Sequence, residues 1–210
     1  MDYYRLLEEN LPGYEKEKAD RINNSTRELE EEERKQKIKD LRFRSEMTSF
    51  MESFFIENYP KYLLEECMKY SVQNPDKKMI GIIHVGIGQE NKYLPGDYVG
   101  YGIGWAGEPR GLNIIFSKEN DESKKKYEYV KDFLKKHKIQ PQGGFVSLSQ
   151  AYRDERKYPE MEPHFLCLPF ENLITKGKEA LKDIEVEKQK LREEATALGI
   201  TLDEISAKKI

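Results

Sequence analysis

The sequence predicts an α+β fold: a mostly antiparallel or mixed sheet of about five strands, packed by helices, with charged helical N- and C-terminal extensions. Residues 79–87 are rich in β-branched side chains, and glycines and aromatic residues intermingle in the segment that follows them. The segments at both ends instead carry dense charges at helical spacing. We therefore expect three regions, which are an N-terminal arm and charged helix (1–45), an α+β core domain (46–174) and a C-terminal helical extension (175–210).

Composition limits the size of the core and the class of partner. The chain has 210 residues, of which 37% are hydrophobic and 36% are charged, against about 25% charged in an average globular protein. This composition predicts one modest core rather than two. The 36 basic and 39 acidic side chains leave a net charge of -3, so the chain as a whole does not attract nucleic acid or anionic lipid, and such binding would need a local patch.

The compartment is predicted from the N-terminus, the hydropathy and the cysteines. Residues 1–5 lack the basic-then-apolar pattern of a signal peptide, and the longest apolar stretch, residues 79–87, is too short to span a membrane. The two cysteines, Cys67 and Cys167, are far apart in the sequence and belong to no Cys-x-x-Cys pair, which favours reduced thiols over a disulfide framework. We expect a cytoplasmic protein that does not bind membranes.

The N-terminal region is predicted as an arm followed by a helix. Turn signals at residues 11–13 and 23–24 predict a loosely held arm. Ser25 and Glu28 form a capping-box pattern, so a helix is expected to begin there. Acidic and basic side chains follow one another at i,i+4 spacing up to about residue 39, which is typical of a solvated helix. From Met47 onward apolar residues recur near helical spacing, so the second half of this helix must pack against the core.

Pro60 is expected to open a second helix, because a proline in the first turn loses no intrahelical hydrogen bond. That helix would end at residues 74–76, and the two helices would meet in a hairpin-like corner.

In residues 79–87 the side chains of both strand faces are mostly apolar, which predicts a buried central strand. Glycine recurs nine times from residue 81 to residue 111, among tyrosines and Trp105, which favours a β-hairpin or a bulged meander.

The rest of the core is predicted as three strands, a helix and a long loop. Strands are expected at residues 112–117, 145–149 and 164–170, where apolar and β-branched residues gather. Residues 122–138 have an acidic start, an apolar face and many lysines, and they predict an amphipathic helix. Residues 151–163 form a polar loop with charges of both signs.

The C-terminal region is predicted to be helical from about Thr175 until Gly199. Its apolar residues fall at alternating spacings of three and four, a coiled-coil-like seam that includes one lysine. The seam consists of Leu181, Ile184, Lys188, Leu191, Ala195 and Leu198. Thr201 and Glu204 form a second capping box and predict a short final helix.

Two patterns with a known chemistry lack the context that this chemistry needs. Residues 102–107 spell G-x-G-x-x-G, yet a strand rather than a helix is predicted to follow, so no helix N-terminus is available for a pyrophosphate. His164 and Cys167 have metal-ligand spacing, and His84 and Cys67 could join them. Residues three apart on one strand point to opposite faces, however, so we expect no metal and no cofactor.

Aromatic and basic residues make up the candidate binding set for nucleic acid or a protein partner. The aromatic side chains of the glycine-rich segment could stack on bases or on a partner, although such residues also pack across the strands of an ordinary sheet. The lysines of the predicted helix and the arginines of the predicted loop could contact phosphates, although solvated surfaces carry the same charges. The candidate residues are Tyr93, Tyr98, Tyr101, Trp105, Arg110, Lys131, Lys135, Arg153 and Arg156.

These patterns support three functional hypotheses. The leading one is a non-enzymatic protein-interaction or assembly component. The charged terminal segments have strong helix signals, but such helices have too little apolar surface to be stable alone. They would pair with each other, with a protein partner or with another copy of the chain. The first alternative is a nucleic-acid-binding protein that uses the lysine-rich helix 122–138 and the surface around Trp105 and Arg110. The second is a small hydrolase or transferase around His84 and His164, although the lack of a linear catalytic motif disfavours an enzyme.

Overall fold

A computed structural model describes residues 3–75, 81–88, 97–102, 110–116, 120–139, 162–166 and 170–201 of the chain. Side chains are described in these ranges except at residues 3–9, 81–82 and 162–166. The strand predicted at 145–149, most of the loop predicted at 151–163 and the helix predicted after Thr201 lie outside the described residues. The chain divides into two compact units, which we call the helical unit (Met1–Ser45, Leu191–Ile210) and the sheet unit (Glu46–Lys190).

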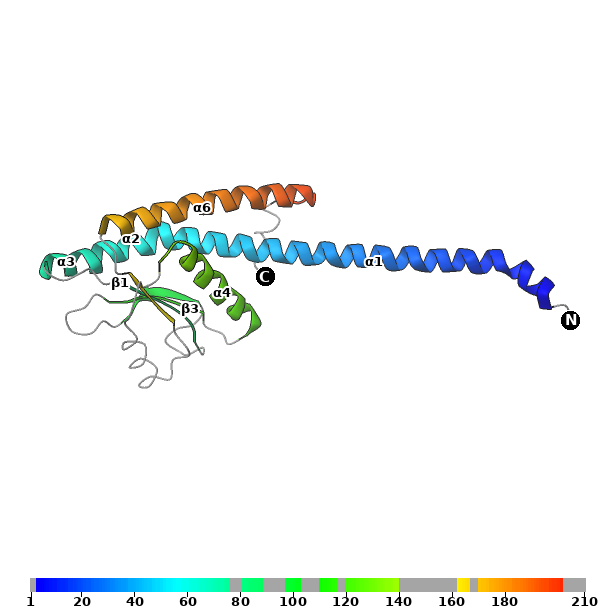
Figure 1. Cartoon of the computed structure of the whole chain (residues 1–210), viewed down its shortest axis with the longest axis horizontal. Helices are drawn as coiled ribbons and strands as arrows, with labels where there is room; N and C mark the ends of the chain where they lie inside the picture. The colour runs from blue at the N-terminus through cyan, green and yellow to red at the C-terminus, as the bar shows by residue number, and fades with distance from the viewer. Residues whose placement is uncertain are drawn as a thin grey trace. The chain divides into compact units, whose positions relative to one another are not determined.

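The first helix, α1 (Tyr3–Ser53), runs through the positions where the sequence predicted a loose arm and a helix start (Figure 1). Both predictions are wrong, because Pro12 lies inside the helix and Ser25 is an interior helical residue rather than a cap. Ion pairs at spacings of three and four stabilise the exposed turns, as between Arg21 and Glu17 at 2.7 Å. Each such pair contributes about 0.2–0.5 kcal/mol, which favours the helix but does not by itself offset the cost of an interior proline, about 3 kcal/mol.

The hairpin-like corner predicted at Pro60 is also wrong, because the helical backbone continues to Gln73. The residues that flank each successive segment keep right-handed helical dihedral angles. In an α-helix a proline ring clashes with the carbonyl four residues earlier. A π-helical turn before Pro60 relieves this clash by moving the hydrogen bonds to i→i+5, as from the Tyr59 N–H to the Phe54 oxygen. The successive segments are η1 (Phe54–Asn58), α2 (Tyr59–Tyr62), η2 (Leu63–Met68) and α3 (Lys69–Gln73), of which η1 and η2 are π-helical.

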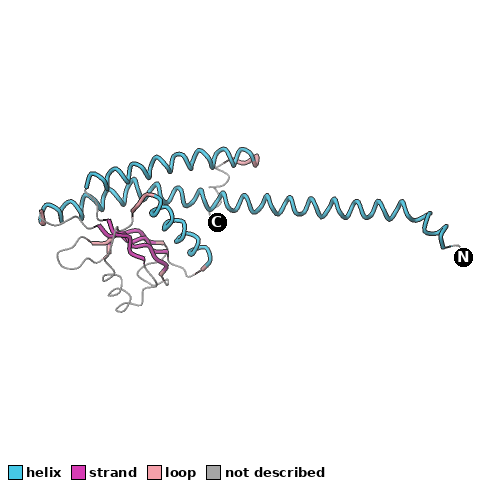
Figure 2. Tube along the Cα trace, in the orientation of Figure 1, coloured by secondary structure: helices cyan, strands magenta, loops and turns pink. Residues whose placement is uncertain are grey.

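The sheet is mixed, as predicted, but its described part has four strands where about five were expected. The strands are β1 (Gly81–Ile87), β2 (Tyr98–Tyr101), β3 (Leu112–Phe116) and β4 (Glu162–Leu166), in the spatial order β2-β3-β1-β4. Figure 2 draws these strands in magenta. β1 is parallel to β3 and antiparallel to β4, and β2 is antiparallel to β3. The strand predicted to reach residue 170 ends earlier, because Phe170 already begins a helix.

The buried central strand predicted at residues 79–87 is confirmed by β1. This strand lies between β3 and β4. Ile83 and Val85 are fully buried and lie opposite Leu112 and Ile114 of β3. β2 and β3 follow one another along the chain and pair in antiparallel fashion, which fits the hairpin predicted from the glycine-rich segment.

Two further helices have the predicted character. Helix α4 (Asp121–Lys136) is capped by Asn120, whose Oδ1 accepts a hydrogen bond of 2.8 Å from the backbone N–H of Ser123. It packs on β1 and β3. Helix α6 (Phe170–Ala197) begins about five residues before the predicted start. Gly199 ends it as predicted, with a φ of 69° that favours glycine.

Aromatic and aliphatic side chains from the helices and the strands form the core of the sheet unit. Phe55 packs against Phe133 of α4 with ring centroids 5.9 Å apart, and Phe50 of α1 lies at the same distance from Phe116 of β3. The helices are thereby fixed on the sheet through ring contacts. The largest fully buried side chains are Tyr59, Tyr62, Phe54, Phe116, Met47, Met51, Ile83, Leu112, Ile114, Leu134 and Ile139.

The helical unit has a small core of its own. Leu41 of α1 packs with Leu191 and Ala195 of α6, and Leu198 and Ile200 cover this cluster. Three residues of the predicted seam, Leu191, Ala195 and Leu198, thus belong to this cluster. The Arg34 guanidinium adds a hydrogen bond of 3.1 Å to the backbone oxygen of Leu198.

Candidate interaction surfaces

An apolar stripe lies on the exposed half of α1. Every side chain from residue 10 to residue 37 is exposed. Leu11, Tyr14, Ile22 and Leu29 are 53%, 62%, 57% and 66% exposed, and their spacings place them within about 80° of one another around a helix that turns 100° per residue. We call these four residues the α1 stripe. Such a stripe is typical of a helix that packs against a second surface.

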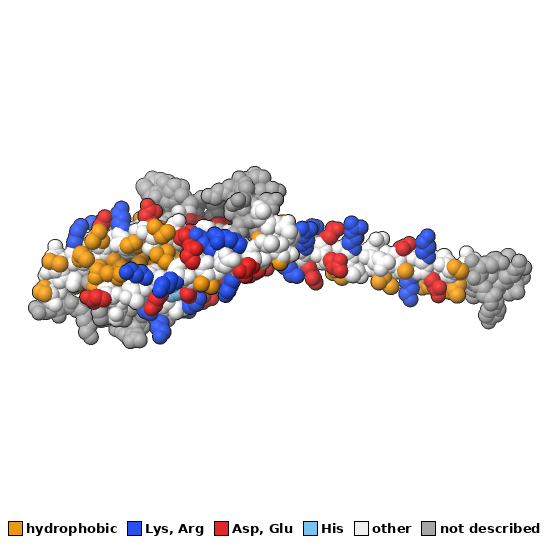
Figure 3. Space-filling model, turned by 90° about the horizontal axis from the view of Figure 1, so that it is seen from above, with side chains coloured by type: hydrophobic (Ala, Val, Ile, Leu, Met, Phe, Trp, Pro, Cys, Tyr) orange, Lys and Arg blue, Asp and Glu red, His pale blue; other side chains and the backbone are white. Residues whose placement is uncertain are grey.

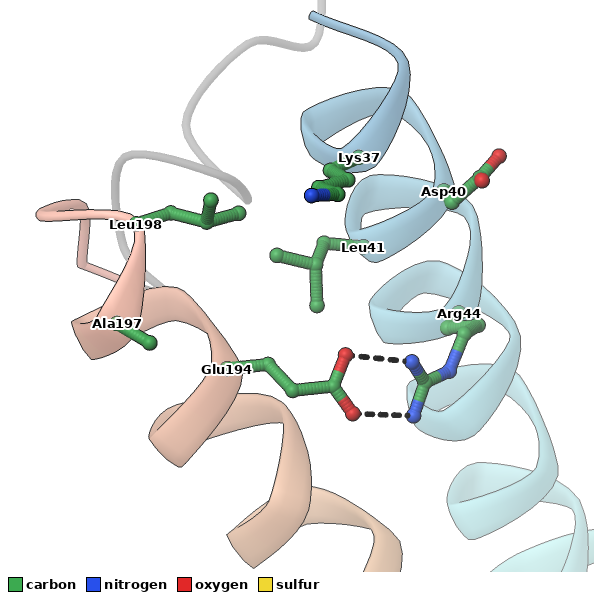
Figure 4. Close-up of a pocket in the computed structure, with 7 residues that line it drawn as sticks. All are labelled: Lys37, Asp40, Leu41, Arg44, Glu194, Ala197 and Leu198. Carbon is green, nitrogen blue, oxygen red and sulfur yellow. Dashed lines mark hydrogen bonds and ion pairs between the residues drawn. The ribbon is translucent and has the colours of Figure 1, made fainter. Parts of the chain in front are cut away.

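A hollow of about 330 Å³ lies in the helical unit, beside the paired segments of α1 and α6 (Figure 4). Leu41 and Leu198 point toward each other across it, and Asp40 points away. Arg44 donates two hydrogen bonds to the Glu194 carboxylate, at 2.7 and 3.1 Å, along one side. The guanidinium and the carboxylate already satisfy one another, so the hollow is a gap between packed helices with a charged rim rather than a reactive site. Its lining consists of Lys37, Asp40, Leu41, Arg44, Glu194, Ala197 and Leu198.

The lysines of α4 are largely paired with carboxylates. Lys126 is only 13% exposed and lies 2.8 Å from Glu46, 3.3 Å from Asp97 and 3.6 Å from Glu122. Burial alone would lower the pKa of Lys126, but the hydrogen bonds and charges of Glu46 and Asp97 outweigh it and raise the pKa. The side chain therefore stays charged and ties three segments of the sheet unit together.

Other lysines of α4 have similar partners. Lys131, one of the candidate binding residues, lies 3.3 Å from Glu128 and over the ring of Tyr127. Lys136 lies 2.7 Å from Asp183 of α6. These carboxylates reduce the positive field that the helix presents to a phosphate. Lys135, the other candidate on this helix, is exposed.

The described aromatic candidates, Tyr98 and Tyr101, lie on β2 at the end of the strand order. Both are half-buried. The ring of Tyr101 packs against Tyr62 with centroids 6.0 Å apart. Its hydroxyl is buried without a hydrogen-bond partner among the described residues, and burial raises its pKa to about 12. Tyr101 therefore contributes to packing between the sheet and η1–α3.

The candidate set is only partly brought together. Arg110 is exposed just before β3, whereas Lys131 and Lys135 lie on α4. Residues 98 and 101 are three apart on one strand, so they occupy opposite faces of the sheet. The other candidates, Tyr93, Trp105, Arg153 and Arg156, lie outside the described residues.

The two histidines of the enzyme hypothesis occupy different positions in the strand ladder. His84 is buried in β1 and lies opposite Pro163, whereas His164 of β4 lies opposite Ile83. Positions offset by one residue belong to opposite faces of a sheet. On the other side of β1, His84 pairs with the buried Asn113 of β3. The register thus places His84 in the sheet core and gives no support to a site that both histidines share.

Sequence reasoning missed one buried histidine, His137, at the C-terminal end of α4. Its Nε2 lies 3.7 Å from the Asp183 carboxylate, and its ring packs on Phe133 with centroids 4.7 Å apart. Burial lowers the pKa of His137 while the charge of Asp183 opposes this shift. The sequence did contain a signal for this residue. His137 lies at the C-terminal end of an amphipathic helix, where a histidine ring lies against the helix end and its pKa is sensitive to its surroundings.

Within the described ranges, no cluster of three or more His, Cys, Asp or Glu side chains is arranged to hold a metal ion. Cys67 is a buried free thiol, and burial raises its pKa to about 12, so it stays protonated and unreactive. Cys167 lies outside the described residues. No helix in the described part of the chain combines the length and the apolarity needed to cross a membrane.

The geometry defines the class of protein as α+β, with a small mixed sheet packed by helices. No protein-family model, curated protein or solved structure matches the chain.

Proposed function

We propose that the chain is a non-enzymatic protein-interaction or assembly component, and that it binds its partner through the exposed half of α1. The α1 stripe carries this proposal. Leu11 and Tyr14 stand at an i,i+3 spacing, and Ile22 and Leu29 at an i,i+7 spacing, which are the anchor positions of a helix that lies in a hydrophobic groove. Charged residues cover the other sides of the same helix.

Energetics support a binding segment of moderate affinity. Burial of a fully exposed side chain of this kind contributes about 1.5–3 kcal/mol. Because the four residues of the α1 stripe are 53–66% exposed, they offer roughly 4–7 kcal/mol before the costs of association. These costs are of similar size, and a helix that is already formed reduces the part due to ordering. Ion pairs such as Arg21–Glu17 stabilise the helix before binding.

The test compares two double variants that add the same charge to α1. Ile22→Asp with Leu29→Asp places two carboxylates on the α1 stripe, whereas Asn23→Asp with Asn24→Asp places two on the opposite side. Affinity capture from an extract of the source cells, with quantitative mass spectrometry, should recover the same partners with the wild type and the asparagine variant. The stripe variant should lose them at least tenfold, while circular dichroism shows that its helix remains.

Retention of every partner by the stripe variant would refute the binding role of α1. Equal loss in both double variants would refute it as well, because the effect would then follow added charge rather than the apolar face.

A further inference from the structure

A second exposed apolar surface lies in the sheet unit, on the helical segment from residue 54 to residue 73. Every fourth residue of this segment is apolar and exposed: Ile56, Leu64 and Val72 are 59%, 59% and 77% exposed, Met68 is 38% exposed, and Pro60 lies between them. Figure 3 shows hydrophobic side chains gathered over this end of the sheet unit. We call the five residues the apolar row.

The opposite sides of the same segment are buried. Phe55, Tyr59, Leu63 and Cys67 also recur at every fourth residue, and each is at most 3% exposed. The segment is therefore apolar toward the core and apolar toward solvent. An exposed apolar row of this kind marks a surface on which another molecule fits.

The π-helical turns keep the apolar row straight. In an α-helix a step of four residues overshoots one turn by about 40°, so Ile56 and Val72 would lie on different sides. The wider turns of η1 and η2, with hydrogen bonds from i to i+5, compensate for this rotation. The result is a row nearly parallel to the helix axis, about 24 Å long at 1.5 Å per residue.

A charged row runs beside the apolar row. Glu57, Lys61, Glu65 and Lys69 also follow at every fourth residue, so acidic and basic side chains alternate along it. Glu65 is half-buried, and the other three are exposed. Within the described residues, none of the four takes part in an ion pair. Their charges are available to a partner.

Both rows are complementary to themselves when a second copy lies antiparallel across a two-fold axis. With Leu64 on the axis, Leu64 meets Leu64 of the partner subunit, and Ile56 meets Val72 of the partner subunit. The charged rows then flank the contact on the same side, and their alternation brings opposite charges together. Glu57 faces Lys69 of the partner subunit, and Lys61 faces Glu65 of the partner subunit. A parallel two-fold pair would instead place the two charged rows on opposite sides of the contact, where they do not meet.

We infer that the apolar row is a homodimer interface, in which the segments 54–73 of two copies pack antiparallel. A two-fold interface uses the same patch on both subunits, and this patch has both the apolar and the charge pattern that such use requires. The surface is distinct from the α1 stripe, so the inference does not rest on the proposed function. A row of this length makes a small interface, for which a Kd in the micromolar range is expected.

Sedimentation equilibrium of the full chain tests the dimer through a charge swap. Lys61→Glu places two pairs of carboxylates in contact across the axis and should raise the dimer Kd at least tenfold. The double variant Lys61→Glu with Glu65→Lys exchanges the two charges and should restore the Kd to within threefold of the wild type. Lys125→Glu, the same change on an exposed residue of α4, should leave the Kd unchanged.

The apolar contact has its own test and the alternatives have distinct results. Leu64→Glu should abolish the dimer up to about 100 μM, because the change is doubled at the axis. A wild-type chain that is monomeric at that concentration overturns the inference. It is also overturned if the charge swap fails to restore the dimer, or if Ile22→Asp with Leu29→Asp dissociates it while Leu64→Glu does not, since the α1 stripe would then be the contact.

Discussion

At the residue scale, His137 is a buried titratable group at the contact between α4 and α6. Its Nε2 atom is buried and has no hydrogen-bond partner among the described residues, although the Asp183 carboxylate is 3.7 Å away. Lys136, Lys176 and Glu179 also act on the ring electrostatically. Burial is the largest of these effects, so the neutral ring is favoured and the pKa falls below its ordinary value of 6.5.

The lowered pKa of His137 predicts a loss of stability in weak acid. Below about pH 6.5 the unfolded chain takes up a proton on this residue before the folded chain does, so the free energy of unfolding falls as the pH falls toward the folded-state pKa. The loss amounts to at most about 1.4 kcal/mol for each pH unit in this window. Urea denaturation at pH 8 and pH 5.5 should show a smaller loss for His137→Gln than for the wild type. Equal losses would contradict the assignment to His137.

At the element scale, sequence patterns predicted those helix ends that are determined by residues within a single turn. The acidic start of α4 and the glycine after α6 are examples, because a cap and a left-handed residue act within one turn. The same reasoning failed at Ser25 and Pro60. Each residue is a local signal for the start of a helix, but the helical backbone runs through both positions. At Pro60 the deciding feature is a π-helical turn, which rearranges hydrogen bonds over five residues and has no counterpart in the propensities of single residues.

The π-helical turns also explain why sequence analysis missed the apolar row. On an α-helical projection the angular positions of Ile56 and Val72 differ by about 160°. The exposed apolar residues are then spread around the helix, and the sequence pattern assigns them to its buried face. The candidate residues that were chosen instead, such as Tyr101, were selected for residue type and local density. Type and density do not separate a ring that packs in the core from one that is free to bind.

Helix α6 offers a test of packing against helix propensity at Gly177. Glycine in a helix interior costs about 1 kcal/mol relative to alanine. An added Cβ would lie 3.0 Å from Cε1 and 3.2 Å from Cδ1 of Tyr59. This ring is only 2% exposed, and its hydroxyl donates a hydrogen bond of 3.0 Å to the Leu173 oxygen, so it cannot move aside. Gly177→Ala should lower the free energy of unfolding by about 1 kcal/mol in urea denaturation, the overpacking cost exceeding the propensity gain.

Gly13 in α1 is the matched control for Gly177. A Cβ added there would meet no atom within 4 Å. Gly13→Ala should therefore show the propensity gain alone, as a small rise in helical circular dichroism without a loss of stability. If Gly177→Ala were stabilising as well, the close approach of Tyr59 would not explain why glycine occupies that position.

At the scale of the whole molecule, the sheet unit is held by contacts between residues that are distant in the sequence. Thr48 and Tyr129 share a hydrogen bond of 3.3 Å, the Tyr59 hydroxyl donates to the Leu173 oxygen, and Lys188 pairs with Glu52. No periodic pattern connects such residues. Periodicity shows which face of an element is buried, but it does not show which element covers it. For this reason α+β was predictable as a class, whereas the partners of individual side chains were not.

Lys126 joins three such segments through charge. Its ammonium group contacts Glu46 of α1, Asp97 before β2 and Glu122 of its own helix. These carboxylates are 56%, 37% and 68% exposed, so water screens the attraction, while the lysine itself is only 13% exposed. An ammonium group in this position is costly to leave unpaired and favourable when several carboxylates surround it.

Substitution of Lys126 by methionine should therefore affect the stability of the sheet unit more than a surface substitution does. We expect Lys126→Met to lower the free energy of unfolding by about 1–2 kcal/mol, between the values for exposed and for buried ion pairs. Lys125→Met on the neighbouring exposed position should change it by less than about 0.5 kcal/mol. The difference between the variants, measured by urea denaturation in dilute buffer, should shrink in 1 M NaCl because salt screens partly exposed charges. Equal effects of both substitutions at low salt would show that the three carboxylates do not stabilise the fold through Lys126.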